Sequence, residues 1–185
     1  MFKGRIAAVL AVVLCLAFFS TFFGREFVGR ATSGKVDMRP TVILDAGHGG
    51  FDGGAVAHDG TVEKDINLKI AAMLKSLLQN SNFNVVMTRE SDVSTDSVET
   101  DKIAVRKKSD LKNRLKLMND YPDAVFVSIH LNKFTTSAAN GSQVFYSGKR
   151  EESKKLGMDI QESIVRLLQP ENQRVNKQAT SSTYI

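Results

Sequence analysis

The feature that most constrains the fold is a glycine-rich stretch, DAGHGGFDGG at residues 45–54, which directly follows a short apolar run. That run, TVILD at residues 41–45, predicts a buried strand, because β-branched apolar segments bounded by turn residues are typical of one. From Glu63 onward, apolar residues recur at three- and four-residue spacing, which predicts an amphipathic helix. A strand, a glycine loop and a helix in this order indicate an α/β fold.

The same alternation continues along the chain and predicts a twisted, largely parallel central sheet flanked by helices. Residues 124–130 carry apolar side chains on both faces, so we expect this strand at the centre of the sheet. The other predicted elements are strands at 84–88 and 142–147, a polar loop at 91–108, a helix from Asp110 to the Tyr121-Pro122 turn, and a helix at 151–168. The inward faces expected for the three helices are Ile66, Ile70, Met73, Leu74 and Leu77; Leu111, Leu115 and Met118; and Leu156, Ile160, Ile164, Leu167 and Leu168.

The amino-terminal part reads as a membrane segment followed by a connector. Lys3 and Arg5 precede an apolar run at residues 6–23, and eighteen helical residues span roughly 27 Å, close to the thickness of a bilayer core. We expect a signal-anchor or transmembrane segment at 1–24, a linker at 25–40 and a domain at 41–185 exported to the cell envelope. A cleaved signal peptide and a buried core helix are the alternatives. Cys15, the only cysteine, lies in this run and is expected to be an apolar filler.

The net charge of +5 is concentrated in the same part of the chain. Residues 1–40 carry six basic side chains against two acidic ones, whereas the remaining residues carry 19 against 18. Nucleic-acid binding requires a basic face on the folded domain, so this distribution argues against a nucleic-acid partner.

The glycine loop invites a phosphate-binding interpretation, which its spacing contradicts. In the dinucleotide fingerprint that begins at Gly47 and Gly49, the third glycine would fall on Asp52. In the other phosphate loop, Gly54 would have to be followed by lysine, but Ala55 follows it. We therefore do not expect a nucleotide site.

The alternative is a metal site. His48 follows the first strand and His130 ends the strand at 124–130, so parallel strands would bring both imidazoles to the same edge of the sheet. Glu63 begins the helix after the loop, and two imidazoles with one carboxylate form an open zinc site. Each residue also has an ordinary interpretation: a histidine can be a hydrogen-bonded loop residue, and Glu63 can favour the positive end of its helix. His58 lies in a polar turn and is expected to be exposed.

Five blocks then occur in an order that resembles a known family: VILDAGHGG, GTVEKDINL, VVMTRESD, LKNRLKLMN and VFVSIHLN. Together, from residue 41 to the end of the chain, they are similar to the zinc-dependent N-acetylmuramoyl-L-alanine amidases of bacterial cell walls, most of all to the members that act in sporulation and germination. The resemblance implies hydrolysis of the amide between N-acetylmuramic acid and L-alanine in peptidoglycan. It also implies zinc as the cofactor, with His48, Glu63 and His130 as its ligands.

The chain departs from the family pattern at its carboxyl end. The family carries a second glutamate, the general base, in a late Glu-x-Gly-Phe stretch that does not occur up to Ile185. We therefore expect a sequence truncated in the carboxyl-terminal part of the catalytic domain, with the base beyond Ile185 and little or no activity in this exact chain. Two rival functions are a non-catalytic, zinc-retaining wall-binding or regulatory protein and another zinc peptidase or deacetylase.

Other residues receive weaker assignments. Asp45 is expected either to hydrogen-bond a ligand imidazole or to cap the turn after its strand. Asn132 is a candidate for contact with the sugar, and Arg89 and Arg114 are expected to form structural ion pairs. Peptidoglycan and the membrane are the expected partners, and the sequence does not identify an activating protein partner.

Overall fold

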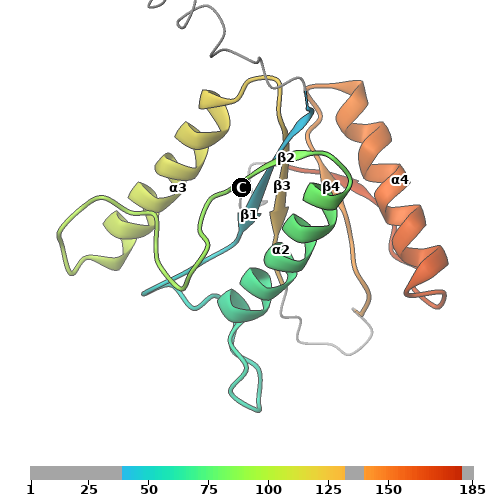
Figure 1. The fold of residues 1–185 in the computed structure, drawn as a ribbon. Coiled ribbons are helices and arrows are strands. Elements are labelled where there is room, and N and C mark those ends of the chain that lie inside the picture. The colour runs from blue at the N-terminus through green and yellow to red at the C-terminus, as the bar shows by residue number, and fades with distance from the viewer. Residues whose placement is uncertain (1–38, 132–139, 181–185) are drawn as a thin grey trace, which may run out of the picture. The chain divides into compact units, whose positions relative to one another are not determined.

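The computed structural model describes residues 39–131 and 140–180 (Figure 1). From Pro40 onward they belong to one compact unit, residues 40–185. The expected anchor at 1–24 and nearly all of the linker at 25–40 lie outside the described residues. Within the described ranges, none of the helices combines the length and the apolarity needed to cross a bilayer.

A three-stranded parallel sheet forms the framework, with β1 (Thr41–Ala46) between β2 (Asn84–Met87) and β3 (Val125–Ile129). The prediction of a parallel α/β sheet is thus confirmed. The expected central position of residues 124–130 is wrong: β1 is central, and its residues from Val42 to Ala46 are at most 6% exposed. In the described part of the chain β3 pairs only with β1, and Val125 is 41% exposed.

Two helices flank this sheet, α2 (Glu63–Asn80) and α3 (Ile103–Asp120). The strand order is β2-β1-β3, so the chain moves one way across the sheet from β1 to β2 and the other way from β2 to β3. Since both crossovers of a parallel sheet are right-handed, the two helices lie on opposite faces (Figure 1).

The predicted start of the second helix at Asp110 is wrong, because α3 begins seven residues earlier, within the stretch expected to be a polar loop. Ile103 and Val105 are 61% and 45% exposed, so the first turns have no buried apolar stripe for periodicity to detect. Ala104, Arg106 and Lys107 are strong helix formers, and propensity accounts for the earlier start.

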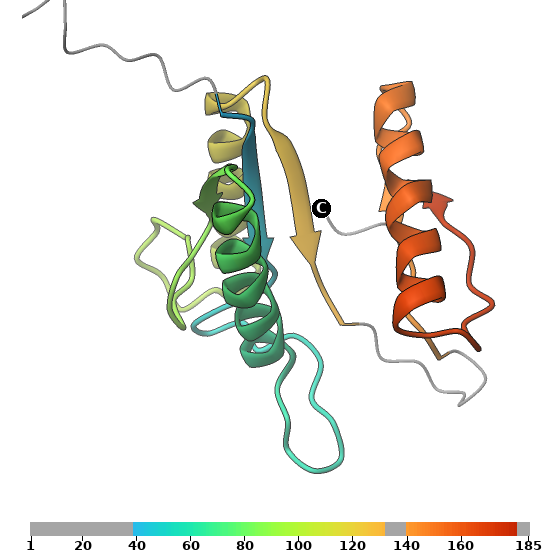
Figure 2. The same ribbon diagram turned by 45° about the vertical axis from the view of Figure 1, so that its right-hand side comes forward.

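The carboxyl-terminal elements form a second, small layer: β4 (Phe145–Tyr146) pairs in parallel with β5 (Lys177–Gln178), and α4 (Glu151–Leu167) packs against β4 (Figure 2). The predicted strand at 142–147 is therefore shortened and belongs to a separate sheet. Side-chain amides explain the shortening. Gln169 and Gln161 accept the amide hydrogens of Ser142 and Val144, and Gln161 and Asn172 donate to the Ser142 carbonyl.

The apolar faces predicted for the helices are largely not the buried ones. In α2 the buried residues are Glu63, Asn67 and Ala71. In α3 only Arg114 is buried, and in α4 only Gly157 and Gln161. Several expected inward residues are instead exposed: Ile70, Met73, Leu77, Leu111, Leu115, Leu156, Leu167 and Leu168.

Candidate metal centre

The register of β1 and β3 brings two histidines together at the carboxyl edge of the sheet. Ala46 pairs with Ile129, and the Gly47 amide donates to the Ile129 carbonyl at 3.0 Å. His48 therefore lies two residues past the end of this ladder and His130 one residue past it. The two rings meet edge to face, with centroids 4.8 Å apart and an interplanar angle of 79°.

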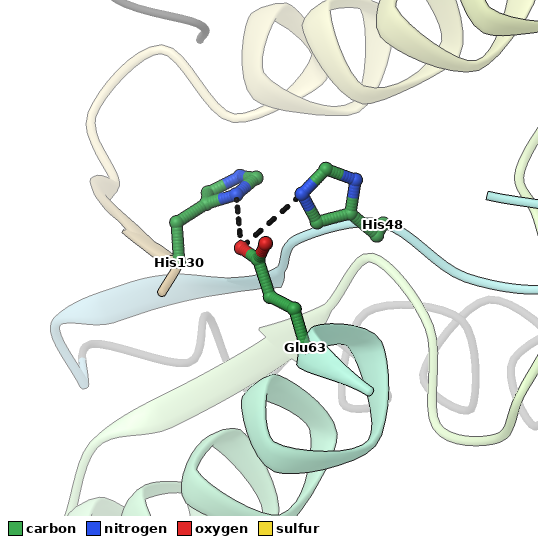
Figure 3. A group of neighbouring side chains, drawn as sticks. All are labelled: His48, Glu63 and His130. Carbon is green, nitrogen blue, oxygen red and sulfur yellow. Dashed lines mark hydrogen bonds and ion pairs between the residues drawn. The ribbon is translucent and has the colours of Figure 1, made fainter. Parts of the chain in front are cut away.

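Glu63, at the first turn of α2, completes the cluster (Figure 3). Its Oε1 lies 3.2 Å from His48 Nε2 and 3.1 Å from His130 Nδ1. One ligand atom from each of the three residues lies within 4.8 Å of the others. The structure thus brings together the three residues that the sequence analysis gave as candidate metal ligands.

Two glycines allow this approach. A Cβ on Gly47 would lie 2.3 Å from the His130 ring, and a Cβ on Gly54 would lie 2.5 Å from His48 and 2.7 Å from Glu63. Gly54 also has a φ of +69°, a conformation that favours glycine. Both positions need a residue without a side chain, because any side chain would occupy the space of the cluster.

The Glu63 carboxylate is held from several sides. Its Oε2 accepts the Ala55 amide at 2.8 Å, and its Oε1 accepts the Leu131 amide at 2.8 Å and the Asn67 side-chain amide at 3.3 Å. Burial opposes ionisation, but these hydrogen bonds and the nearby His48 outweigh it and lower the pKa of Glu63. The carboxylate is therefore anionic at neutral pH.

The protonation of the imidazoles follows from their neighbours. His48 Nδ1 lies 2.9 Å from Asp52 Oδ2, and an ionised carboxylate can only accept, so Nδ1 carries the proton. With Nδ1 as the donor to Asp52, Nε2 is the ring atom that faces the Glu63 oxygen. Burial, followed by the proximity of His48, lowers the pKa of His130, which favours its neutral form.

This donor set fits a divalent cation. An imidazole lone pair facing a carboxylate oxygen at 3.2 Å requires a proton or a cation between them. Ligand atoms about 2.0–2.2 Å from a tetrahedral zinc ion lie about 3.4 Å apart, close to the separations from Glu63 Oε1 given above. Two neutral imidazoles and one carboxylate are the protein ligands of many catalytic zinc sites.

Asp45 does not contact an imidazole in the described structure. It accepts hydrogen bonds from Thr88, Ser128 and Arg114, beneath the loop. Arg114 forms an ion pair with Asp45 and another with Asp110, as expected of a structural arginine. Arg89 instead donates to backbone carbonyls.

Asp52 is the carboxylate that the sequence interpretation missed. Besides His48, it contacts Lys107 of α3 at 2.9 Å. Its position four residues after a histidine, inside the glycine loop, was the available signal. Asn67 was also missed. It is fully buried one helical turn after Glu63 and donates to Glu63 and to the Gly47 carbonyl.

Three further expectations concern residues away from the cluster. His58 is exposed, as predicted. Asn132 lies outside the described residues. The position of a general base after Ile185 stays a prediction.

Comparison with known proteins gives a consistent set of similarities. A sequence model of the N-acetylmuramoyl-L-alanine amidase family matches residues 42–184. The germination-specific N-acetylmuramoyl-L-alanine amidase of Bacillus subtilis is 39% identical over 137 residues, which are 74% of this chain and 55% of that protein. The amidase AmiA of Escherichia coli is 32% identical over 128 residues, 69% of this chain and 39% of that protein.

Solved structures agree. The CwlD amidase from Clostridioides difficile, determined in complex with the GerS lipoprotein, has a TM-score of 0.74 and 41% identity, covering 77% of this chain and 74% of that one. The amidase AmiC2 of Nostoc punctiforme has a TM-score of 0.62 and 26% identity, covering 79% and 71%. The chain spans about half or less of the length of the curated relatives compared here.

Proposed function

The chain belongs to the N-acetylmuramoyl-L-alanine amidase family, and from this premise we propose that it hydrolyses the amide bond between N-acetylmuramic acid and L-alanine in peptidoglycan, using zinc held by His48, Glu63 and His130. The observation that carries the proposal is the convergence of both imidazoles on one Glu63 oxygen, at 3.1 and 3.2 Å. When bound, such an ion supplies Lewis acidity, which polarises a carbonyl and lowers the pKa of water.

The residues around the cluster have separate tasks in this proposal. Asp52 fixes the proton of His48 on Nδ1, so that Nε2 is free to bind the ion. The amides of Ala55 and Leu131 keep Glu63 ionised and oriented. Desolvation keeps His130 neutral near pH 7, the form in which an imidazole can ligate.

We propose the cell envelope as the place of action, with residues 1–24 as the anchor. Sporulation or germination is the proposed setting, since one relative is named for germination. A lipoprotein partner is proposed on the precedent of the solved CwlD–GerS complex.

The metal site is tested by zinc titration of the purified chain against a chelating dye. Wild-type protein should bind one zinc ion per chain, and His130→Ala should lose the site. His58→Ala is the matched control, because it removes an exposed histidine outside the cluster and should bind zinc like the wild type. Equal zinc uptake by all three proteins would refute the ligand assignment.

The reaction is tested by mass spectrometry of digested peptidoglycan. An amidase releases stem peptides with a free L-alanine amino terminus, whereas a carboxypeptidase releases a terminal amino acid and a deacetylase releases acetate. Zinc binding by this chain without any amidase product would favour the wall-binding alternative.

A further inference from the structure

Arg89 has an environment unlike that of the other buried arginine. It lies two residues after the end of β2 and is 3% exposed. It donates four hydrogen bonds to backbone carbonyls, those of Ala46, Gly47, Lys64 and Ser91, at 2.8–3.1 Å. Within the described ranges it forms no ion pair with a carboxylate. All four hydrogen bonds of this buried guanidinium thus go to carbonyls, while the charges of Asp92, Asp45 and Asp110 act on it from a longer range.

Burying a guanidinium without a carboxylate partner is costly. Burial, together with the charge of Arg114, lowers the pKa of Arg89, which reflects the unfavourable surroundings of its charge. A buried apolar side chain would avoid that cost, and without Arg89 the Ala46 carbonyl would keep Arg114 as a donor and the Gly47 carbonyl would keep Asn67. The hydrogen bonds of Arg89 therefore matter less for satisfying single carbonyls than for holding three backbone segments at fixed separations.

The bound carbonyls lie next to the cluster. Gly47 immediately precedes His48, and Lys64 immediately follows Glu63, and a single nitrogen, Nη2, donates to both, at 3.0 and 2.8 Å. Nε donates to Ala46, the last residue of β1. One rigid, planar group thus ties the end of the strand, the glycine loop and the first turn of α2 together.

His48 needs such support. Its φ of +62° is uncommon for a residue other than glycine and persists only where the surroundings impose it. Arg114 donates to the His48 carbonyl at 2.9 Å, so each of three consecutive carbonyls, from Ala46 to His48, accepts from at least one buried arginine.

We infer that Arg89 is a positioning residue of the metal centre: its guanidinium sets the separation between the backbones that carry His48 and Glu63, and so sets the affinity for zinc. The inference rests on the proposed zinc site. It predicts that the planar shape of the Arg89 guanidinium matters more for zinc affinity than its positive charge, because a positive charge near the site would by itself repel the zinc ion.

Two substitutions separate shape from charge. Arg89→Lys keeps the charge but loses the planar fork, and Arg89→Met removes both while keeping a long side chain. If Arg89 positions the ligands, both variants bind zinc more weakly, Arg89→Lys by about 10-fold and Arg89→Met by up to about 100-fold. If only its charge mattered, Arg89→Met would bind zinc more tightly and Arg89→Lys would match the wild type.

The measurement is zinc affinity by chelator competition at 20 °C, with circular dichroism to confirm that each metal-free protein is folded. Arg174→Lys and Arg174→Met are the matched controls, since Arg174 donates to the Asn140 carbonyl and to Gln143, neither of which belongs to the cluster. They should bind zinc like the wild type. The visible spectrum of the cobalt-substituted protein should change for Arg89→Lys and stay unchanged for Arg174→Lys.

The outcomes are distinguishable from failure of the zinc site itself. If the wild type binds zinc, His130→Ala does not, and Arg89→Lys binds with wild-type affinity and spectrum, the positioning role is refuted while the site stands. If wild type and His130→Ala behave alike, the zinc site is refuted. Should Arg89→Met fail to fold, Arg89→Lys decides. A lower melting temperature with unchanged zinc affinity would reduce Arg89 to a structural role.

Discussion

Asp52 shows how a single side chain can connect the cluster to the rest of the domain. It contacts His48 through one oxygen and Lys107 of α3 through the other. Burial opposes its ionisation, but His48 and Lys107 outweigh burial and lower its pKa, so it stays anionic near neutral pH. The orientation of the imidazole therefore depends on a charge supplied by the loop itself.

Asp52→Asn should weaken zinc binding by about 10-fold, because an amide accepts the Nδ1 proton less strongly than a carboxylate. Chelator competition measures the change. Asp59→Asn is the control, since Asp59 is an exposed carboxylate on the same loop that accepts the Thr61 amide. Similar affinities in the two variants would contradict a role for Asp52 in holding His48.

Gly54→Ala should abolish or greatly weaken zinc binding, because the added methyl would meet His48 and Glu63 at 2.5 and 2.7 Å. Gly60→Ala is a close control. Its φ is +85°, so alanine suffers a similar backbone strain there, but no atom lies within 4 Å of the added methyl. Equal zinc affinity in the two variants would show that crowding of the cluster is not the reason for glycine at position 54.

At this scale the sequence revealed the residues at the ends of strands but not those reached through folding of the loop. His48 and His130 could be paired because parallel strands end at one edge of the sheet. Glu63 was a candidate because it begins the next helix, and the family resemblance implied all three as ligands. Asp52 could not be distinguished in the sequence from an ordinary turn aspartate. Its contact with His48 depends on the left-handed backbone of His48 and Gly50, which the sequence does not reveal. Asn67 was hidden because a polar residue on a helix is usually exposed.

At the scale of elements, each of the described helices α2, α3 and α4 is attached through a buried polar side chain. Asn67 of α2 reaches the Gly47 carbonyl, Arg114 of α3 reaches the His48 carbonyl, and Gln161 of α4 bonds the backbone of Ser142, Val144 and Arg174. Periodicity located the helices but largely missed their buried faces, because it counts only apolar residues. The periodicity of apolar residues also missed the first turns of α3, because their apolar side chains are exposed.

Asp110 links α3 to the preceding segment: it accepts from the Thr95 amide and from Arg114, both at 2.7 Å. Burial opposes its ionisation, but these partners outweigh burial and lower its pKa from 3.8. A lowered folded-state pKa contributes stability above the unfolded value, and that stability is lost as the pH falls below it.

We therefore expect the melting temperature of the wild type to fall more between about pH 5 and pH 3 than that of Asp110→Asn. Thermal unfolding followed by circular dichroism measures both. Asp120→Asn, which removes an exposed ion pair with Lys116, should keep the wild-type profile. Parallel profiles for the wild type and Asp110→Asn would contradict this role of Asp110.

At the scale of the molecule, the parallel α/β architecture was predictable from the alternation of strands and helices. The order of the strands was not. Apolar residues on both faces suggested that residues 124–130 were central, yet β1 holds that place. Which strand lies between the others is decided by crossovers, which local patterns do not encode.

Because the proposed ion would join the end of β1, α2 and the end of β3, its removal should destabilise the whole domain. Zinc at about 1,000 times its dissociation constant stabilises a folded protein by about 4 kcal/mol, which raises the melting temperature by about 10 °C in a domain of this size. Calorimetry with zinc and with a chelator should show this shift. His130→Ala should show none, and an equal shift in that variant would place the ion elsewhere.

The alignment of β1 with β3 has a consequence for assembly. Successive side chains of a strand point to opposite faces, so a slip of one residue along this ladder would send the His130 ring to the other side of the sheet. Only the native alignment would then be able to capture the ion, and capture would in turn trap that alignment. Metal uptake during refolding would therefore selectively stabilise molecules in which β1 and β3 have paired in the native register.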